Sequence, residues 1–74
     1  MRLSEFWALM AQEFGSGYAG VVSRTQSLGS IEGRTAHEAL EQGMPVRAVW
    51  EAVVRDMNVP PQHHWLADPE ERRG

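Results

Sequence analysis

The hydrophobic residues of the chain recur at helical spacing through most of its length. Region 46–57 has the clearest pattern, because apolar residues recur at every third or fourth position and charged residues occupy the opposite face. This spacing is typical of an amphipathic α-helix. The apolar positions are Val46, Val49, Trp50, Val53 and Met57, and the charged positions are Arg47, Glu51 and Arg55. We predict a long helix here, with an i, i+4 ion pair between Glu51 and Arg55.

A second amphipathic pattern covers residues 3–14. Ser4 is suited to cap this helix, because its side-chain oxygen can accept from a free backbone N–H. Gly15 is suited to end it, because glycine adopts positive φ without penalty. The predicted buried face comprises Leu3, Phe6, Trp7, Met10 and Phe14. Leu9 lies off this face and is predicted to be exposed.

Residues 16–28 favour a helix less strongly. Gly17 and Gly20 each cost about 1 kcal/mol relative to alanine in a helix, and the β-branched pair Val21 and Val22 favours a strand. We still predict a helix, because no second strand is apparent to pair with this region. Its apolar positions would be Tyr18, Val21, Val22, Thr25 and Leu28.

Residues 29–34 are predicted to form a loop with Ile31 turned inward. Thr35 and Glu38 then have the T-x-x-E spacing of a capping box, in which each side chain accepts a hydrogen bond from the other residue's backbone. This predicts a short helix over 35–42, ended by Gly43. Pro45 suits the first turn of the following helix, where its missing N–H is no loss.

These elements predict an all-α fold. It is a compact bundle of three main helices plus the short helix, with a helix-turn-helix-like outline at residues 35–57. We expect one helical domain over 1–61 and a partly disordered C-terminal tail over 62–74, although Trp65 and Leu66 could fold back onto the bundle. The residues assigned a structural role are Phe6, Trp7, Met10, Phe14, Thr35, Glu38, Gly43, Val49, Trp50 and Val53.

The composition narrows the classes of function that the protein can have. The chain has 74 residues, no cysteine and a net charge of -3, so disulfides, thiolate metal sites and thiol catalysis are excluded. It has neither a signal-peptide pattern nor a long apolar run, and we predict a cytoplasmic protein without membrane contact. A domain this small rarely gains more than about 3–5 kcal/mol from its core. A protein partner or a homo-oligomer is therefore expected.

The adjacent residues His63 and His64 are weak candidates for a metal site. Two ligands are too few for a structural zinc ion, and a third would have to come from His37, Asp68 or a glutamate at no recognised spacing. A general base also needs a partner and a pocket. We predict no metal, no cofactor and no enzymatic activity, and a metal-responsive role for the two histidines is the weakest of three functional hypotheses.

Residues 35–52 have the outline of a helix-turn-helix, in which Ala39, Gly43 and Val49 fit the usual positions. However, the second helix carries acidic residues as well as arginines, whereas DNA affinity depends on excess positive charge. We therefore favour a non-enzymatic protein-interaction module over a DNA-associated accessory protein of helix-turn-helix type. Trp65, outside the periodic helices, is either the anchor of a docked tail or an exposed contact residue. The candidate interaction residues are Arg47, Glu51, Arg55 and Trp65.

A set of short motifs also resembles a known family. They are Met1-Arg2-Leu3-x-x-Phe6-Trp7, Phe14-Gly15, Tyr18-Ala19, Gly33-Arg34-Thr35, Glu38-Ala39-Leu40, Gly43, Val49-Trp50 and Val59-Pro60. In this order, over about residues 1–61, they resemble the small actinobacterial proteins grouped as domain of unknown function 3046. The resemblance implies no catalytic residue. Through the genes that neighbour those of the family, it implies a DNA-repair context. Val54 stands where many relatives have cysteine, and the tail beyond Pro61 has no counterpart.

Overall fold

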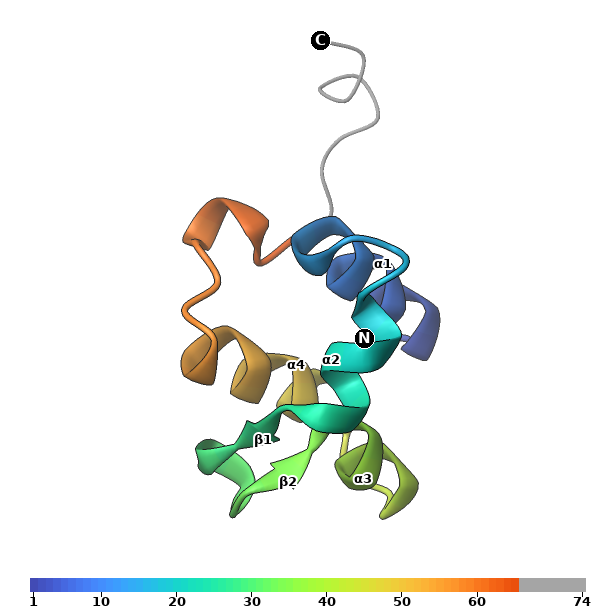
Figure 1. Ribbon diagram of the computed structural model, residues 1–74, viewed down its shortest axis with the longest axis vertical. Helices are drawn as coiled ribbons and strands as arrows, with labels where there is room; N and C mark the ends of the chain where they lie inside the picture. Colours follow the sequence, from blue (N-terminus) through green and yellow to red (C-terminus); the bar gives the residue numbers. More distant parts are fainter. Residues whose placement is uncertain (66–74) are drawn as a thin grey trace, which may run out of the picture.

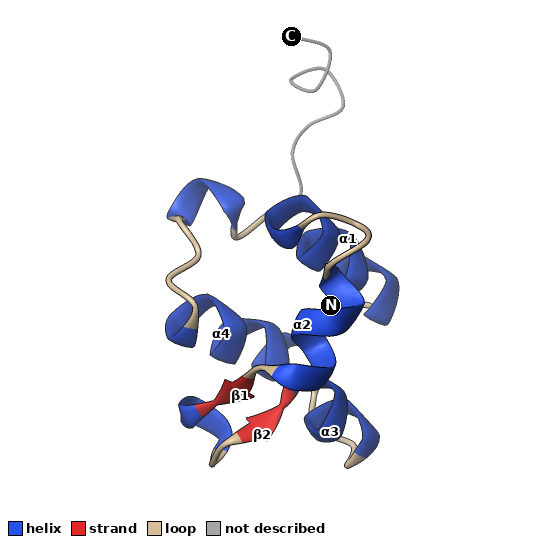
Figure 2. Ribbon diagram, viewed as in Figure 1, coloured by secondary structure: helices blue, strands red, loops and turns tan. Residues whose placement is uncertain are grey.

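The computed structural model describes residues 1–65, which form a helical bundle with one very short β-hairpin (Figure 1, Figure 2). The α-helices are α1 (Leu3–Phe14), α2 (Ala19–Thr25), α3 (Ala36–Glu41) and α4 (Val46–Asp56). Two 3-10 helices, η1 (Gly29–Ile31) and η2 (Pro61–His63), and two strands, β1 (Ser27–Leu28) and β2 (Arg34–Thr35), complete the fold. The predicted all-α class is confirmed, because each strand has only two residues.

The core lies between α1 and α4 and extends under α2, the hairpin and α3. Phe6 of α1 meets Trp50 of α4 edge to face, with ring centroids 6.2 Å apart, a geometry that aromatic pairs favour. The buried apolar residues are Phe6, Leu9, Met10, Ala19, Val22, Leu28, Ile31, Ala36, Ala39, Val49, Trp50, Ala52, Val53 and Val59. Trp7, Phe14 and Met57 are only half-buried and pack against the edge of this cluster.

Two predictions for α1 are wrong. Leu3 is 49% exposed and Leu9 is only 2% exposed, so the buried face is centred on Phe6, Leu9 and Met10 rather than running back to Leu3. The N-terminal cap also differs, because the helix begins at Leu3 and leaves Ser4 inside it. The Glu5 carboxylate accepts from the backbone N–H of Arg2 at 3.4 Å.

The predicted helix over 16–28 is shorter than expected, and the hairpin that follows it was not predicted. β1 pairs antiparallel with β2, with Ser27 opposite Thr35 and Leu28 opposite Arg34. Glu32 and Gly33 have φ of 62° and 79°, which lets the chain reverse within a few residues. The helix buries the face that carries Ala19, Val22 and Ser23. Tyr18 and Val21 lie off this face and are 59% and 39% exposed, and Thr25 is exposed as well.

The predicted capping box at the start of α3 is confirmed. Thr35 Oγ1 accepts from the Glu38 N–H at 3.1 Å, and Glu38 Oε1 accepts from the Thr35 N–H at 2.9 Å. The hydrogen bond that the Thr35 backbone N–H donates to this carboxylate is the main reason that the pKa of the Glu38 carboxyl lies below its ordinary value. The connection over 42–45 then leads directly into α4, with Gly43 at a φ of 85°.

Candidate interaction groove

Residues 58–65 turn back from the end of α4 and cross to α1 (Figure 1). Asn58, at a φ of 53°, reverses the chain, and the Val59 N–H then donates to the Val54 carbonyl at 3.1 Å. The Trp50 indole Nε1–H donates to the His64 carbonyl at 3.2 Å. On the other side, the Gln12 side-chain amide donates to the Trp65 carbonyl at 2.9 Å. The segment is therefore fixed to both principal helices through its backbone.

The two adjacent histidines contact different partners. His63 Nδ1 lies 2.6 Å from Glu13 Oε2, whose side chain is only 18% exposed. His64 Nε2 lies 2.8 Å from the Val59 carbonyl oxygen, which can only accept, so this nitrogen carries the proton. Within residues 1–65 no group of three or more histidine, aspartate or glutamate side chains could hold a metal ion. Asp68, considered above as a third ligand, and Leu66 lie outside the described residues.

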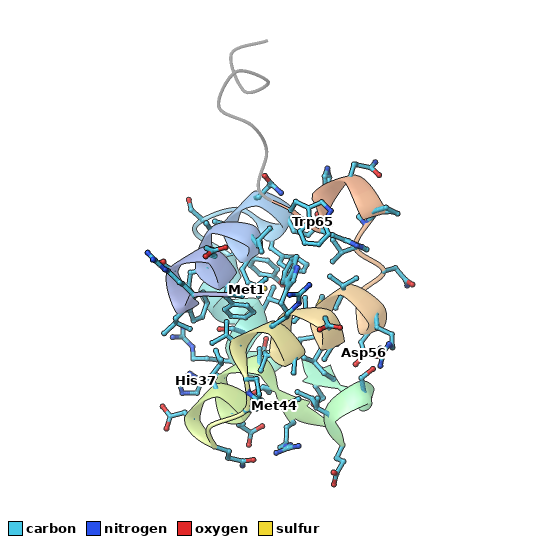
Figure 3. The ribbon with its side chains drawn as sticks, turned by 180° about the vertical axis from the view of Figure 1, so that it is seen from behind. Met1, His37, Met44, Asp56 and Trp65 are labelled. Carbon is cyan, nitrogen blue, oxygen red and sulfur yellow. The ribbon has the colours of Figure 1, made fainter. Side chains whose placement is uncertain are left out.

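The segment forms one wall of an open groove on the face where Met1 and Trp65 lie (Figure 3). We call this cavity of about 300 Å³ the Trp65 groove. Its lining residues are Met1, Arg47, Trp50, Glu51, Val54, Arg55, His64 and Trp65. A second cavity of about 340 Å³ shares Met1, Arg47 and Trp65 with it and reaches Glu5 and Leu9 of α1. The four predicted interaction residues thus all line the same groove.

Trp65 combines a fixed backbone with an exposed ring. Its carbonyl accepts from Gln12, yet its side chain remains 65% exposed, more than any other large hydrophobic residue within 1–65. The tail is therefore docked as far as this residue through the backbone carbonyl, and the indole is left mostly exposed.

The charged row of α4 is arranged differently from the prediction. Glu51 is ion-paired with Arg47, at 3.8 Å from its Nε, rather than with Arg55. Asp56 is held by Ser30, whose hydroxyl and backbone N–H donate to it at 2.6 and 2.8 Å. Both bonds hold the pKa of the Asp56 carboxyl below its ordinary value, and the bond from the hydroxyl has the larger effect. Arg55 has no hydrogen bond or salt bridge to any residue of the described region.

Four of the lining residues were not predicted as interaction residues: Met1, Val54, Trp50, which was assigned to the core, and His64, which was a weak metal candidate. Val54 lies on α4, and Met1 and His64 line the groove beside it. That Trp50 has a hydrogen-bond acceptor could be predicted, because the N–H of a buried tryptophan normally donates to one. The residue that supplies this acceptor could not be deduced, because the contact joins residues 14 positions apart.

The structure is thus that of a small helical protein with an open groove of mixed apolar and charged lining. The sequence matches the family described as a protein of unknown function (DUF3046) over residues 1–62, and the chain belongs to this family. No curated protein matches the chain, and no solved structure does either. Among the described residues, no helix has the length and apolar character needed to span a membrane.

Proposed function

We propose that this protein is a non-enzymatic protein-interaction module that binds its partner in the Trp65 groove. The exposed Trp65 indole carries this proposal. Tryptophan is enriched among the few residues that dominate binding energy at protein interfaces, and a contiguous exposed apolar surface commonly marks a contact site. Trp50, Val54 and Met1 extend the apolar lining beside it, with charged residues of α4 at the rim.

The polar groups of the groove support binding rather than catalysis. They comprise two guanidinium groups, one carboxylate paired with Arg47, and the His64 imidazole held by a backbone carbonyl. None of them pairs with a side-chain nucleophile in the described region, as acyl or phosphoryl transfer through a covalent intermediate would need.

A DNA-associated role has weaker support. α3 and α4 are consecutive helices, as a helix-turn-helix requires. The exposed charges of α4 are Arg47, Glu51, Arg55 and Asp56. They sum to zero, whereas phosphate contacts need a surplus of basic residues.

Replacing Trp65 with alanine is expected to weaken partner capture strongly without affecting the fold. The immobilised full chain would be exposed to a lysate of its source organism, and the recovered proteins quantified by mass spectrometry. Loss of a tryptophan at an interface centre costs about 2 kcal/mol or more, so recovery should fall by about tenfold or more.

The matched control is Tyr18→Ala, which removes another exposed aromatic ring, 59% accessible, that does not line the groove. Recovery should then equal that of the unsubstituted chain. Equal recovery by Trp65→Ala and Tyr18→Ala, or no specific recovery by any of the three proteins, would contradict the proposed function.

A further inference from the structure

We propose that the Trp65 groove binds a short peptide segment in which a bulky apolar residue lies close to an aspartate or glutamate. The apolar side chain would fill the space between Trp50, Val54 and Trp65, and the carboxylate would pair with the Arg55 guanidinium. This inference rests on the proposed function and adds the chemistry of the partner to it.

The charge arrangement around Arg55 points to an acidic partner. Each acidic neighbour of Arg55 already has another partner, because Glu51 pairs with Arg47 and Asp56 accepts from Ser30. Arg55 is thus a cation at the groove whose donors are unused within residues 1–65. A guanidinium recognises a carboxylate through two parallel hydrogen bonds. The charged side chains of α4 that line the groove are two arginines and one glutamate, in a chain whose net charge is -3.

The size of the groove indicates a short segment. Its volume of about 300 Å³ lies at the lower end of the range for ligand pockets, about 300–1,000 Å³. Such a space accepts one bulky side chain. The adjoining cavity beside Glu5 and Leu9 lets the peptide continue across α1.

A second copy of this chain is a poorer occupant. In a two-fold dimer the same surface patch meets itself. The acidic side chain that this patch offers from α4 is Glu51, which is already paired with Arg47. Arg55 would therefore meet no unpaired carboxylate of α4 across such an interface, whereas a peptide can bring its own.

Selection from a library of phage-displayed random dodecapeptides on the immobilised full chain tests this inference. We expect enrichment of peptides that carry an aromatic or large aliphatic residue close to an acidic one. For a synthesised peptide from this set, Arg55→Glu should weaken binding by about tenfold or more, because a hydrogen bond to a charged group contributes about 1.5–3 kcal/mol. Arg24→Glu, a charge reversal of an exposed arginine outside the groove, should leave the affinity unchanged.

Changing the peptide's acid to its amide completes a double-mutant cycle. The amide should weaken binding to the unsubstituted chain but not to Arg55→Glu, in which the peptide's acid would face a like charge and its removal relieves repulsion. Circular dichroism would verify that both charge reversals are folded.

Other outcomes separate this inference from the proposed function. Peptides without an acid, or equal effects of Arg55→Glu and Arg24→Glu, would overturn the inference while leaving a Trp65-dependent binding function in place. Enriched peptides that bind Trp65→Ala normally, or no enrichment, would overturn both. Sedimentation showing self-association that Trp65→Ala abolishes would identify a second copy as the occupant and overturn the inference alone.

Discussion

Trp50→Ala is expected to leave most of the chain unfolded at room temperature. The Trp50 side chain is 3% exposed, meets Phe6 edge to face and donates to the His64 carbonyl. Truncating a buried tryptophan to alanine costs about 3–5 kcal/mol. A domain of this size rarely has more than about 3–5 kcal/mol available, so the loss consumes most of its stability. Urea denaturation followed by circular dichroism at 222 nm measures the effect.

Two other substitutions calibrate this result. Trp50→Phe keeps an aromatic ring against Phe6 but loses the indole N–H, and should cost about 1 kcal/mol for the hydrogen bond, plus the smaller ring's lost packing. Trp65→Ala removes an exposed ring and should change the stability by less than about 0.5 kcal/mol. If Trp50→Ala unfolded cooperatively at the same midpoint urea concentration as the unsubstituted chain, this would show that α1 and α4 are not joined through this residue.

Gly15→Ala should give the second largest loss of stability. Gly15 ends α1 at a φ of 90° and a ψ of 141°, close to a backbone region that only glycine occupies readily, and strain of this kind costs about 1–3 kcal/mol. An added Cβ would meet nothing within 4 Å, so the expected cost comes from the backbone alone. Thermal unfolding should show a lowered midpoint for this variant.

Gly17→Ala provides the matched comparison in the same loop. Gly17 also has open space for a Cβ, and its φ is not positive. Replacing it with alanine should leave the stability unchanged or raise it slightly, because the unfolded chain loses freedom. Equal destabilisation by the two substitutions would mean that the loop after α1 does not have this backbone conformation.

The helices with strong sequence signals were the parts of the fold that could be predicted. The apolar spacing of α4 and the reciprocal side-chain bonds of Thr35 and Glu38 are local, so they can be deduced from residues a few positions apart. The hairpin could not, because β1 was too short to give an alternating pattern. Leu9 is buried and Leu3 exposed because of how the other elements pack on α1, and this packing is a property of the whole fold.

The same reasoning applies to the groove. Arg47, Glu51 and Arg55 were predicted to share one face of a helix, and helical spacing alone is enough to place them together. That Trp65 joins them depends on the reversal at Asn58 and on hydrogen bonds from Trp50 and Gln12. Neither follows from local pattern, so the sequence could suggest Trp65 as a contact residue but not its position.

The docked position of residues 61–65 is the central claim, because His64 and Trp65 form the wall of the groove that faces α4. Nuclear Overhauser effects in a ¹⁵N-labelled sample of the full chain test it most directly. The account predicts cross-peaks from the Trp50 indole N–H to protons of His64, and from the Gln12 side-chain amide to protons of Trp65. Absence of both sets, with the amides of His63, His64 and Trp65 exchanging as fast as in a free peptide, would contradict it.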